Sequence, residues 1–137
     1  MNESQSPEIA EHTSPFSFAV TLQRLVDAIA KSGMTLFASI DHAANARSAG
    51  ATMPPTTVLL YGNAKGGTPI MLTTPQAALD LPLRVLVREA ADGKVSIAFH
   101  PITPLLHRVG VPVGAAARLE PAQRMLLSAL APSQGSG

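Results

Sequence analysis

Residues 83–99 have the sequence LRVLVREAADGKVSIAF, and this stretch decides the fold. Leu83–Glu89 is rich in leucine and valine and is expected to form a β-strand. Asp92-Gly93 is a strong turn signal, because a tight hairpin needs residues that tolerate a left-handed backbone. Val95–Phe99 is then expected to return as the partner strand. The hairpin predicts that at least part of the sheet is antiparallel.

Upstream of the hairpin, further segments have strand character. Phe16–Val20 is a short apolar run with alternate side chains on one face, and it predicts a strand. Met34–Ile40 alternates at strand spacing, with Phe37 on the more polar face, where it is either an ordinary exposed aromatic or a dimer contact. Thr57–Tyr61 is continuously apolar and predicts a central strand.

Helix signals alternate with these strands and follow them. Helical spacing, capping residues and prolines at first helical positions predict helices over 22–33, 41–49, 68–74, 103–110 and 120–130, with Pro75 interrupting or restarting the third. Thr21 is expected to cap the first of these helices. Residues 62–67, Gly-Asn-Ala-Lys-Gly-Gly, predict a flexible loop.

This order of elements predicts an α+β domain. The expected architecture is a two-layer sandwich, a mainly antiparallel sheet with helices packed on one face, because that buries the apolar stripes in the simplest way. A chain of 137 residues and 14.2 kDa fits one domain. We expect a disordered N-terminal arm over residues 1–14, the domain over 15–131 and a flexible C-terminal tail over 132–137.

Composition excludes several classes of function. With 46% hydrophobic residues the chain has ample core material, and a net charge of +1 gives no general attraction for nucleic acid or anionic membranes. The sequence has no uninterrupted run of about 18 apolar residues, so no membrane-spanning helix is predicted. No secretory signal is visible, and the cytoplasm is therefore the expected location. Zero cysteines exclude disulfides and thiolate metal sites, and the spacing of the four histidines predicts no metal site and no cofactor.

Three segments in this order resemble the domain of unknown function 302 family, a family of bacterial type. They are SIDHAANA at 39–46, LLYGNAKGGTP at 59–69 and ALDLPLRVLV at 78–87, and the resemblance covers roughly residues 16–110. It implies a compact α/β sandwich that is often dimeric, and it implies no established activity. This chain has Phe99-His100-Pro101 where members of the family often carry an Asn-Asp pair after the last strand.

Polar residues gather after two of the predicted strands and suggest one ligand site. Lys65 and the free N–H groups near Thr68 would hold a small anion, since a helix start favours negative charge. Asn63 and His42 would fix the orientation of the ligand, with Asp41 beside them at the same cleft. The bland alternatives are a tight glycine turn with a solvated lysine, and a helix cap beside a surface histidine.

Two other functions remain open on the sequence. An enzyme could use His42 as general acid or base assisted by Asp41, although neighbouring residues on a helix do not face each other. A purely structural homodimer could form through a sheet edge or through Phe37. The leading hypothesis is a non-enzymatic domain that binds a small ligand, self-associates as a homodimer, or does both.

Overall fold

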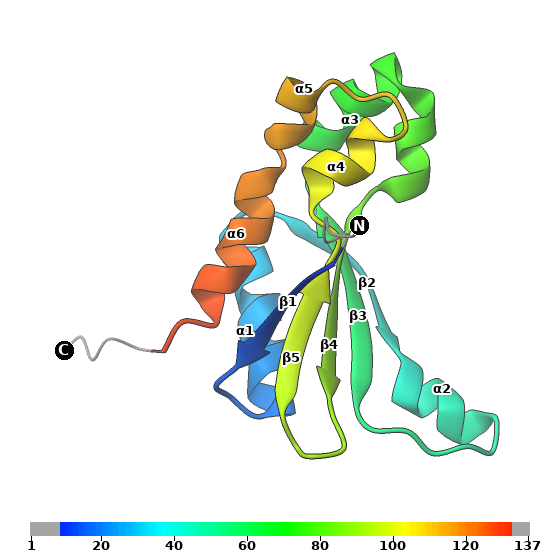
Figure 1. Ribbon diagram of the computed structural model, residues 1–137, viewed down its shortest axis with the longest axis vertical. Helices are drawn as coiled ribbons and strands as arrows, with labels where there is room; N and C mark the ends of the chain where they lie inside the picture. Colours follow the sequence, from blue (N-terminus) through cyan, green and yellow to red (C-terminus); the bar gives the residue numbers. More distant parts are fainter. Residues whose placement is uncertain (1–8, 133–137) are drawn as a thin grey trace, which may run out of the picture.

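The computed structural model describes residues 9–132, drawn as a coloured ribbon in Figure 1. The elements along the chain are β1 (Ala10–Ser14), α1 (Phe18–Lys31), β2 (Thr35–Asp41), α2 (His42–Ser48), β3 (Thr56–Gly62), α3 (Ala64–Thr73), the 3-10 helix η2 (Pro75–Asp80), β4 (Leu83–Glu89), β5 (Val95–Phe99), α4 (Ile102–His107), α5 (Val113–Ala117) and α6 (Glu120–Ala129). The predicted hairpin is confirmed as β4 and β5, and the predicted α+β fold is confirmed.

The strands form one sheet in the order β1-β5-β4-β3-β2, and every neighbouring pair is antiparallel. The hairpin turn uses the residues that the sequence singled out. Gly93 has a φ of 88°, and the Asp92 carboxylate accepts a hydrogen bond of 2.9 Å from the Lys94 N–H. Local turn chemistry therefore sets the register between β5 and the central strand β4.

The helices divide into a layer against the sheet and a group at its end (Figure 1). Helix α1 packs on one face of the strands, and α6 packs against α1. We call α3, η2, α4 and α5 the helical lobe; these elements gather at the end of the sheet where β3 ends and β4 begins (Figure 1). Helix α2 lies beside β3 at the opposite end.

The core lies between the sheet and helices α1 and α6. Its largest fully buried side chains come from α1, β3, β4, β5, α4 and α6, and they include Leu25, Ile29, Leu59, Tyr61, Val85, Val87, Ile97, Leu106 and Leu126. The Tyr61 hydroxyl is buried and has no hydrogen-bond partner among the described residues. Burial raises the pKa of the Tyr61 phenol well above its ordinary value.

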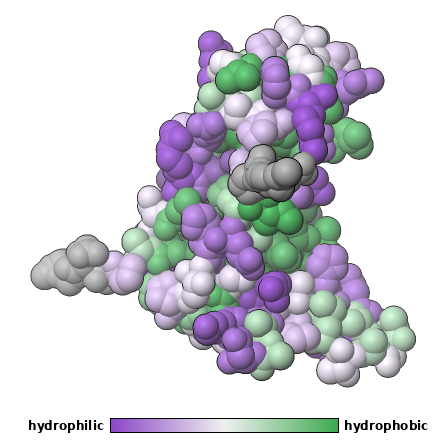
Figure 2. Space-filling model, viewed as in Figure 1, coloured by the Kyte–Doolittle hydropathy of each residue, from purple (hydrophilic) through white to green (hydrophobic). Residues whose placement is uncertain are grey.

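The other face of the sheet is not covered by α1, and we call it the open face. Strand register places one apolar row across it, because residues paired in antiparallel strands point to the same side. The row is Ile40, Val58, Leu86 and Ala98. Figure 2 shows hydrophobic surface over these strands. Arg84 lies two residues before Leu86 on the same face, and Arg88 lies two residues after it.

The N-terminal predictions need two corrections. Residues 10–14 were expected in a disordered arm but form β1 at the sheet edge, paired with β5. Phe16–Val20 was expected as a strand, but α1 begins at Phe18 because the Ser17 side chain caps it by accepting from the Val20 N–H. Thr21 is buried in this helix and bonds the Ser14 hydroxyl at 2.6 Å instead of capping. Residues 1–8 and 133–137 of the expected arm and tail lie outside the described residues.

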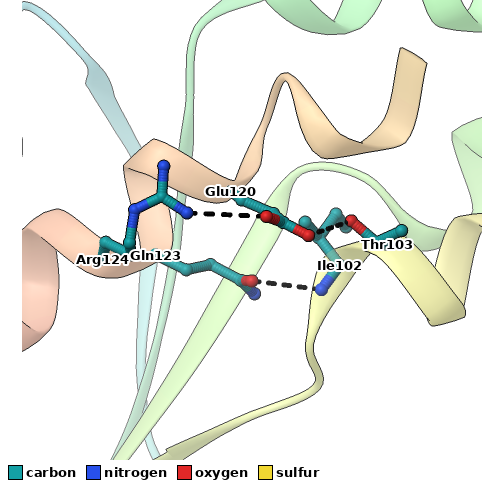
Figure 3. A network of polar contacts seen from close by, with 5 residues as sticks. All are labelled: Ile102, Thr103, Glu120, Gln123 and Arg124. Carbon is teal, nitrogen blue, oxygen red and sulfur yellow. Dashed lines mark hydrogen bonds and ion pairs between the residues drawn. The ribbon is translucent and has the colours of Figure 1, made fainter. Parts of the chain in front are cut away.

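A polar clamp fixes α6 to the segment that follows β5 (Figure 3). The buried Gln123 side chain accepts from the Ile102 N–H at 3.1 Å and donates to the His100 carbonyl at 2.8 Å. Glu120 accepts from the Thr103 hydroxyl and pairs with Arg124 at 3.5 Å. The clamp holds the start of α6 next to the helical lobe.

No helix among residues 9–132 is long and apolar enough to cross a membrane.

Candidate functional site

The predicted ligand residues do not form one cleft. β2 and β3 are antiparallel, with Asp41 opposite Thr57 and Thr35 opposite Gly62. Asp41 and His42 therefore lie near the start of β3, while Asn63 and Lys65 follow its end. Five residue steps along a strand span roughly 17 Å. The expectation of a shared cleft is wrong. Residues that follow two neighbouring strands lie at the same edge of the sheet only when the strands are parallel, and β2 and β3 are antiparallel.

Asp41 and His42 have a local structural role in the described chain. The Asp41 carboxylate accepts a 2.9 Å hydrogen bond from the Ala44 N–H and caps α2, as its position at a helix start predicted. His42 is exposed at the first position of this helix and lines neither of the two cavities described below. Among residues 9–132, no three histidine or acidic side chains converge where a metal ion could bind.

The glycine-rich segment is helical and not a loop. The Asn63 side chain accepts from the Lys65 N–H at 2.9 Å and caps α3, which begins at Ala64. The expected helix start at Thr68-Pro69 is therefore wrong by one turn. A side chain at Gly66 would meet Leu119 at 3.3 Å, so this glycine lets α3 approach the segment between α5 and α6 closely.

A cavity of about 320 Å³ lies where β3 passes into α3. We call it the apolar cavity, because its walls are almost wholly hydrophobic; they include Phe37, Leu60, Met71, Leu81, Pro82 and Leu119. Gly67 also lines it, and the carbon of an added methyl group there would lie 3.7 Å from Leu81 and 3.8 Å from Met71. Asn63 is the polar residue among the lining side chains. Its amide nitrogen makes no hydrogen bond with the described residues.

An irregularity in β2 turns Phe37 toward this cavity. The register with β3 shifts between Leu36 and Ala38, so Phe37 has no paired residue opposite it. A bulge of this kind redirects a side chain. The Phe37 ring lies 3.9 Å from the place of a Cβ at Gly62 and is 52% exposed. The aromatic ring therefore forms one wall of the apolar cavity.

A second cavity of about 390 Å³ adjoins the first. We call it the arginine cavity, since Arg118 lines it. The two cavities share Gly62, Asn63, Leu83 and Leu119 in their walls. The arginine cavity is otherwise bounded by the end of α1, through Ser32, and by the first half of α6, through Ala122 and Met125. Together the cavities occupy the junction of the strand ends with the helical lobe and α6.

Of the predicted site residues, only Asn63 lines these cavities. Lys65 and Thr68 lie exposed on α3 and Asp41 and His42 lie at the far end, so a part of these side chains in ligand binding remains a prediction. The sequence analysis missed the apolar walls and Arg118. Phe37, an aromatic out of pattern in a strand, was the one available signal.

Comparison with known proteins adds a family and a fold. The sequence profile of the family described as Domain of unknown function DUF302 matches residues 10–131. The crystal structure of an uncharacterized conserved protein DUF302 from Bacillus stearothermophilus superposes with a TM-score of 0.83, covering 92% of this chain and 100% of that one. The two sequences are 16% identical, so this likeness concerns the fold.

Curated relatives match part of the chain. The fluoride-specific ion channels FluC 1 of Brucella suis biovar 1 (strain 1330) and FluC 1 of Brucella abortus biovar 1 (strain 9-941) are each 39% identical to it over 82 residues. The match covers 60% of this chain, 32% of the first channel protein and 30% of the second. The chain thus spans about a third of the length of these relatives.

Proposed function

The chain belongs to the domain of unknown function DUF302 family, and from that premise and the cavity geometry we propose a non-enzymatic domain that binds a small apolar ligand. The observation that carries this is the apolar cavity of about 320 Å³ at the end of β3. Cavities of this size and lining are the usual form of small-molecule sites. We place this function in the cytoplasm. Fluoride conduction is not carried over, because the match covers about a third of the channel proteins.

Specific side chains support the assignment of the apolar cavity as the ligand site. Phe37 and Met71 offer an aromatic face and an adaptable thioether to an apolar ligand. The Asn63 amide offers a hydrogen-bond donor at the wall, which would orient a polar atom of the ligand. The glycine at position 67 keeps the cavity open on the side of α3.

A matched pair of glycine variants tests this proposal. Gly67→Ala adds a methyl group to the cavity, while Gly114→Ala adds one to α5, where nothing lies within 4 Å. Both changes favour helix by about 1 kcal/mol, so stability is controlled. Binding of the neutral dye N-phenyl-1-naphthylamine would be followed by fluorescence. We expect Gly67→Ala to lower the affinity for the dye about tenfold and Gly114→Ala to leave that affinity unchanged.

Amide NMR locates the bound dye in the same experiment. Shifts confined to Phe37, Asn63, Gly67 and Leu119 would support the proposal. No saturable binding, or shifts spread evenly over the surface, would remove it. The enzymatic alternative is tested separately, since His42→Ala should abolish any turnover that depends on His42 without unfolding the domain.

A homodimer is the second candidate, favoured by the apolar row across the open face. The occupant we propose is a second copy of this chain, with the two open faces together. A sheet of this size has a flat area of about 500 Å² per copy, which approaches the surface that a standard interface buries on each partner. The two arginines that flank the row leave its apolar centre free for this contact.

Two valine variants test whether the dimer forms through the open face. Val58 lies in the row and Val20 is 45% exposed on α1, so each can be replaced by lysine. Sedimentation velocity should show a dimer for the parent protein and for Val20→Lys, and a monomer for Val58→Lys. A parent protein that stays monomeric at all concentrations would rule the dimer out.

A further inference from the structure

Arg118 is the only charged residue among the described residues that line the apolar and arginine cavities. It follows α5 as the C-cap residue and precedes α6, so its backbone is held between two helices. Its guanidinium makes no hydrogen bond or ion pair with the described residues, whereas Arg124 pairs with Glu120, and Arg88 with Glu11. Within the described part of the chain, a cation without a partner therefore lies in the wall of the arginine cavity, which adjoins the apolar cavity.

The lining of the two cavities is divided by chemistry. Phe37, Leu60, Met71 and Leu81 line only the apolar cavity, and Arg118 and Ser32 line only the arginine cavity. Asn63 and Leu119 belong to both, so the two spaces meet at these residues. A molecule with a hydrophobic body and a polar head fits this division. Between residues 9 and 132 no carboxylate lines either cavity, so the charge that these residues place at the head position is positive.

We infer that the ligand is an amphipathic acid whose hydrophobic body fills the apolar cavity and whose carboxylate binds Arg118. Guanidinium is the side chain best suited to a carboxylate, since its planar donors form two parallel hydrogen bonds with the acid. The Asn63 amide lies between body and head and donates to an oxygen of the same acid. This inference rests on the proposed apolar-ligand function and names the class of its ligand.

The preference for an acid over a neutral ligand depends on the charge of Arg118, which lies at an exposed site. Arg118 is exposed, so solvent screens the attraction and the gain for an acid over a neutral molecule is moderate. We expect an acid to bind about fivefold more tightly than the matching alcohol, with the ratio falling as salt is added. A matching amine should bind more weakly than the alcohol, because like charges meet at the head position.

Three ligands of equal chain length provide the test: octanoate, 1-octanol and octylammonium at pH 7, titrated by calorimetry. The arginine variant is Arg118→Gln, and the control is Arg47→Gln in the last turn of α2, at the other end of the sheet. For the parent protein and the control we expect the affinity to decrease from octanoate to octanol to octylammonium. In Arg118→Gln, octanoate should fall to the affinity of octanol, while octanol binding is unchanged.

The outcomes separate the two proposals. Equal affinity for octanoate and octanol in the parent protein would overturn the inference that the ligand is an acid. An equal loss of affinity for both ligands in Arg118→Gln would overturn it as well. Either result would leave the proposed apolar site unaffected. Failure of all three ligands and of the dye to bind would overturn the apolar site itself. Circular dichroism of each variant confirms that the fold is intact, so that a lost affinity reports on the head position.

Discussion

Replacing Tyr61 with phenylalanine should stabilise this protein, against the usual direction of a core substitution. The side chain is fully buried in the core, and its hydroxyl has no partner among the described residues. A buried hydroxyl without a hydrogen bond costs about 1–3 kcal/mol relative to water. Tyr61→Phe removes that cost and keeps the ring contacts. Allowing for the small void left by the oxygen, we expect a gain of about 1 kcal/mol in the free energy of unfolding at pH 7.

The pH dependence gives this prediction a second, independent readout. Burial raises the folded-state pKa of Tyr61, so the stability that the neutral phenol contributes is present below the unfolded pKa of about 10 and is lost as pH rises above it. At pH 10.5, ionisation of Tyr61 in the unfolded state lowers the free energy of unfolding of the parent protein by roughly 0.8 kcal/mol. The advantage of Tyr61→Phe should therefore grow by that amount. Lysine titration is common to both proteins and cancels.

Urea unfolding followed by circular dichroism measures both effects. Tyr61 is the single tyrosine of the chain, so absorbance of the phenolate near 295 nm should appear only as the protein unfolds. A variant less stable than the parent by 1 kcal/mol or more at pH 7 would refute the reasoning, because it would mean that the hydroxyl is hydrogen-bonded. An advantage that does not change between pH 7 and 10.5 would refute the raised pKa.

Three further stability changes follow from buried or capping polar groups, each measured by urea unfolding. Gln123→Ala should cost about 2–4 kcal/mol, since it removes one buried and one partly buried hydrogen bond. The exposed control Gln76→Ala should change stability by less than about 0.5 kcal/mol, and similar losses for both variants would contradict the clamp. Asp41→Ala should cost about 1 kcal/mol through the lost α2 cap, and Asp41→Asn should recover most of it. Thr21→Val should cost about 1–3 kcal/mol because it leaves the buried Ser14 hydroxyl without this partner, and a neutral result would sink that account.

Local signals predicted the hairpin and most helices. Gly93 and Asp92 determine the turn between β4 and β5 through their own backbone and side chain. The cap at Asp41 also acts over a few residues, which is why the start of α2 was predictable. Such features depend on the chain immediately around them and need no knowledge of distant contacts.

The first strand depends on distant contacts and was not predictable from its own residues. Ala10–Ser14 is polar, and Ser14 is its only buried residue, so the segment lacks the alternating apolar pattern of a strand. Its hydrogen bonds come from β5, with Ala10 opposite Phe99. An edge strand of this kind is determined by the partner that it pairs with, and its own sequence carries almost no signal.

The site was only partly predictable for a topological reason. Asp41 and Asn63 each follow a predicted strand, and this shared position suggested that they belong to one cleft. Instead α2 lies in a return between antiparallel strands, so the two residues lie at opposite ends. The walls of the apolar cavity come from β2, β3, α3, the segment that joins η2 to β4, and the segment before α6, and only the folded chain brings these together.

The pairing of β1 with β5 imposes an order on how the domain assembles. Among residues 9–132, β1 is the first strand and pairs only with β5, the last, and the paired residues are up to 89 positions apart. During synthesis β1 leaves the ribosome long before its partner exists, and it must wait unpaired until the hairpin is complete. Closing so long a loop is slow and entropically costly. We therefore expect docking of β1 to be a late step in folding, and the half-made sheet to be the species most open to contact with chaperones or with other chains.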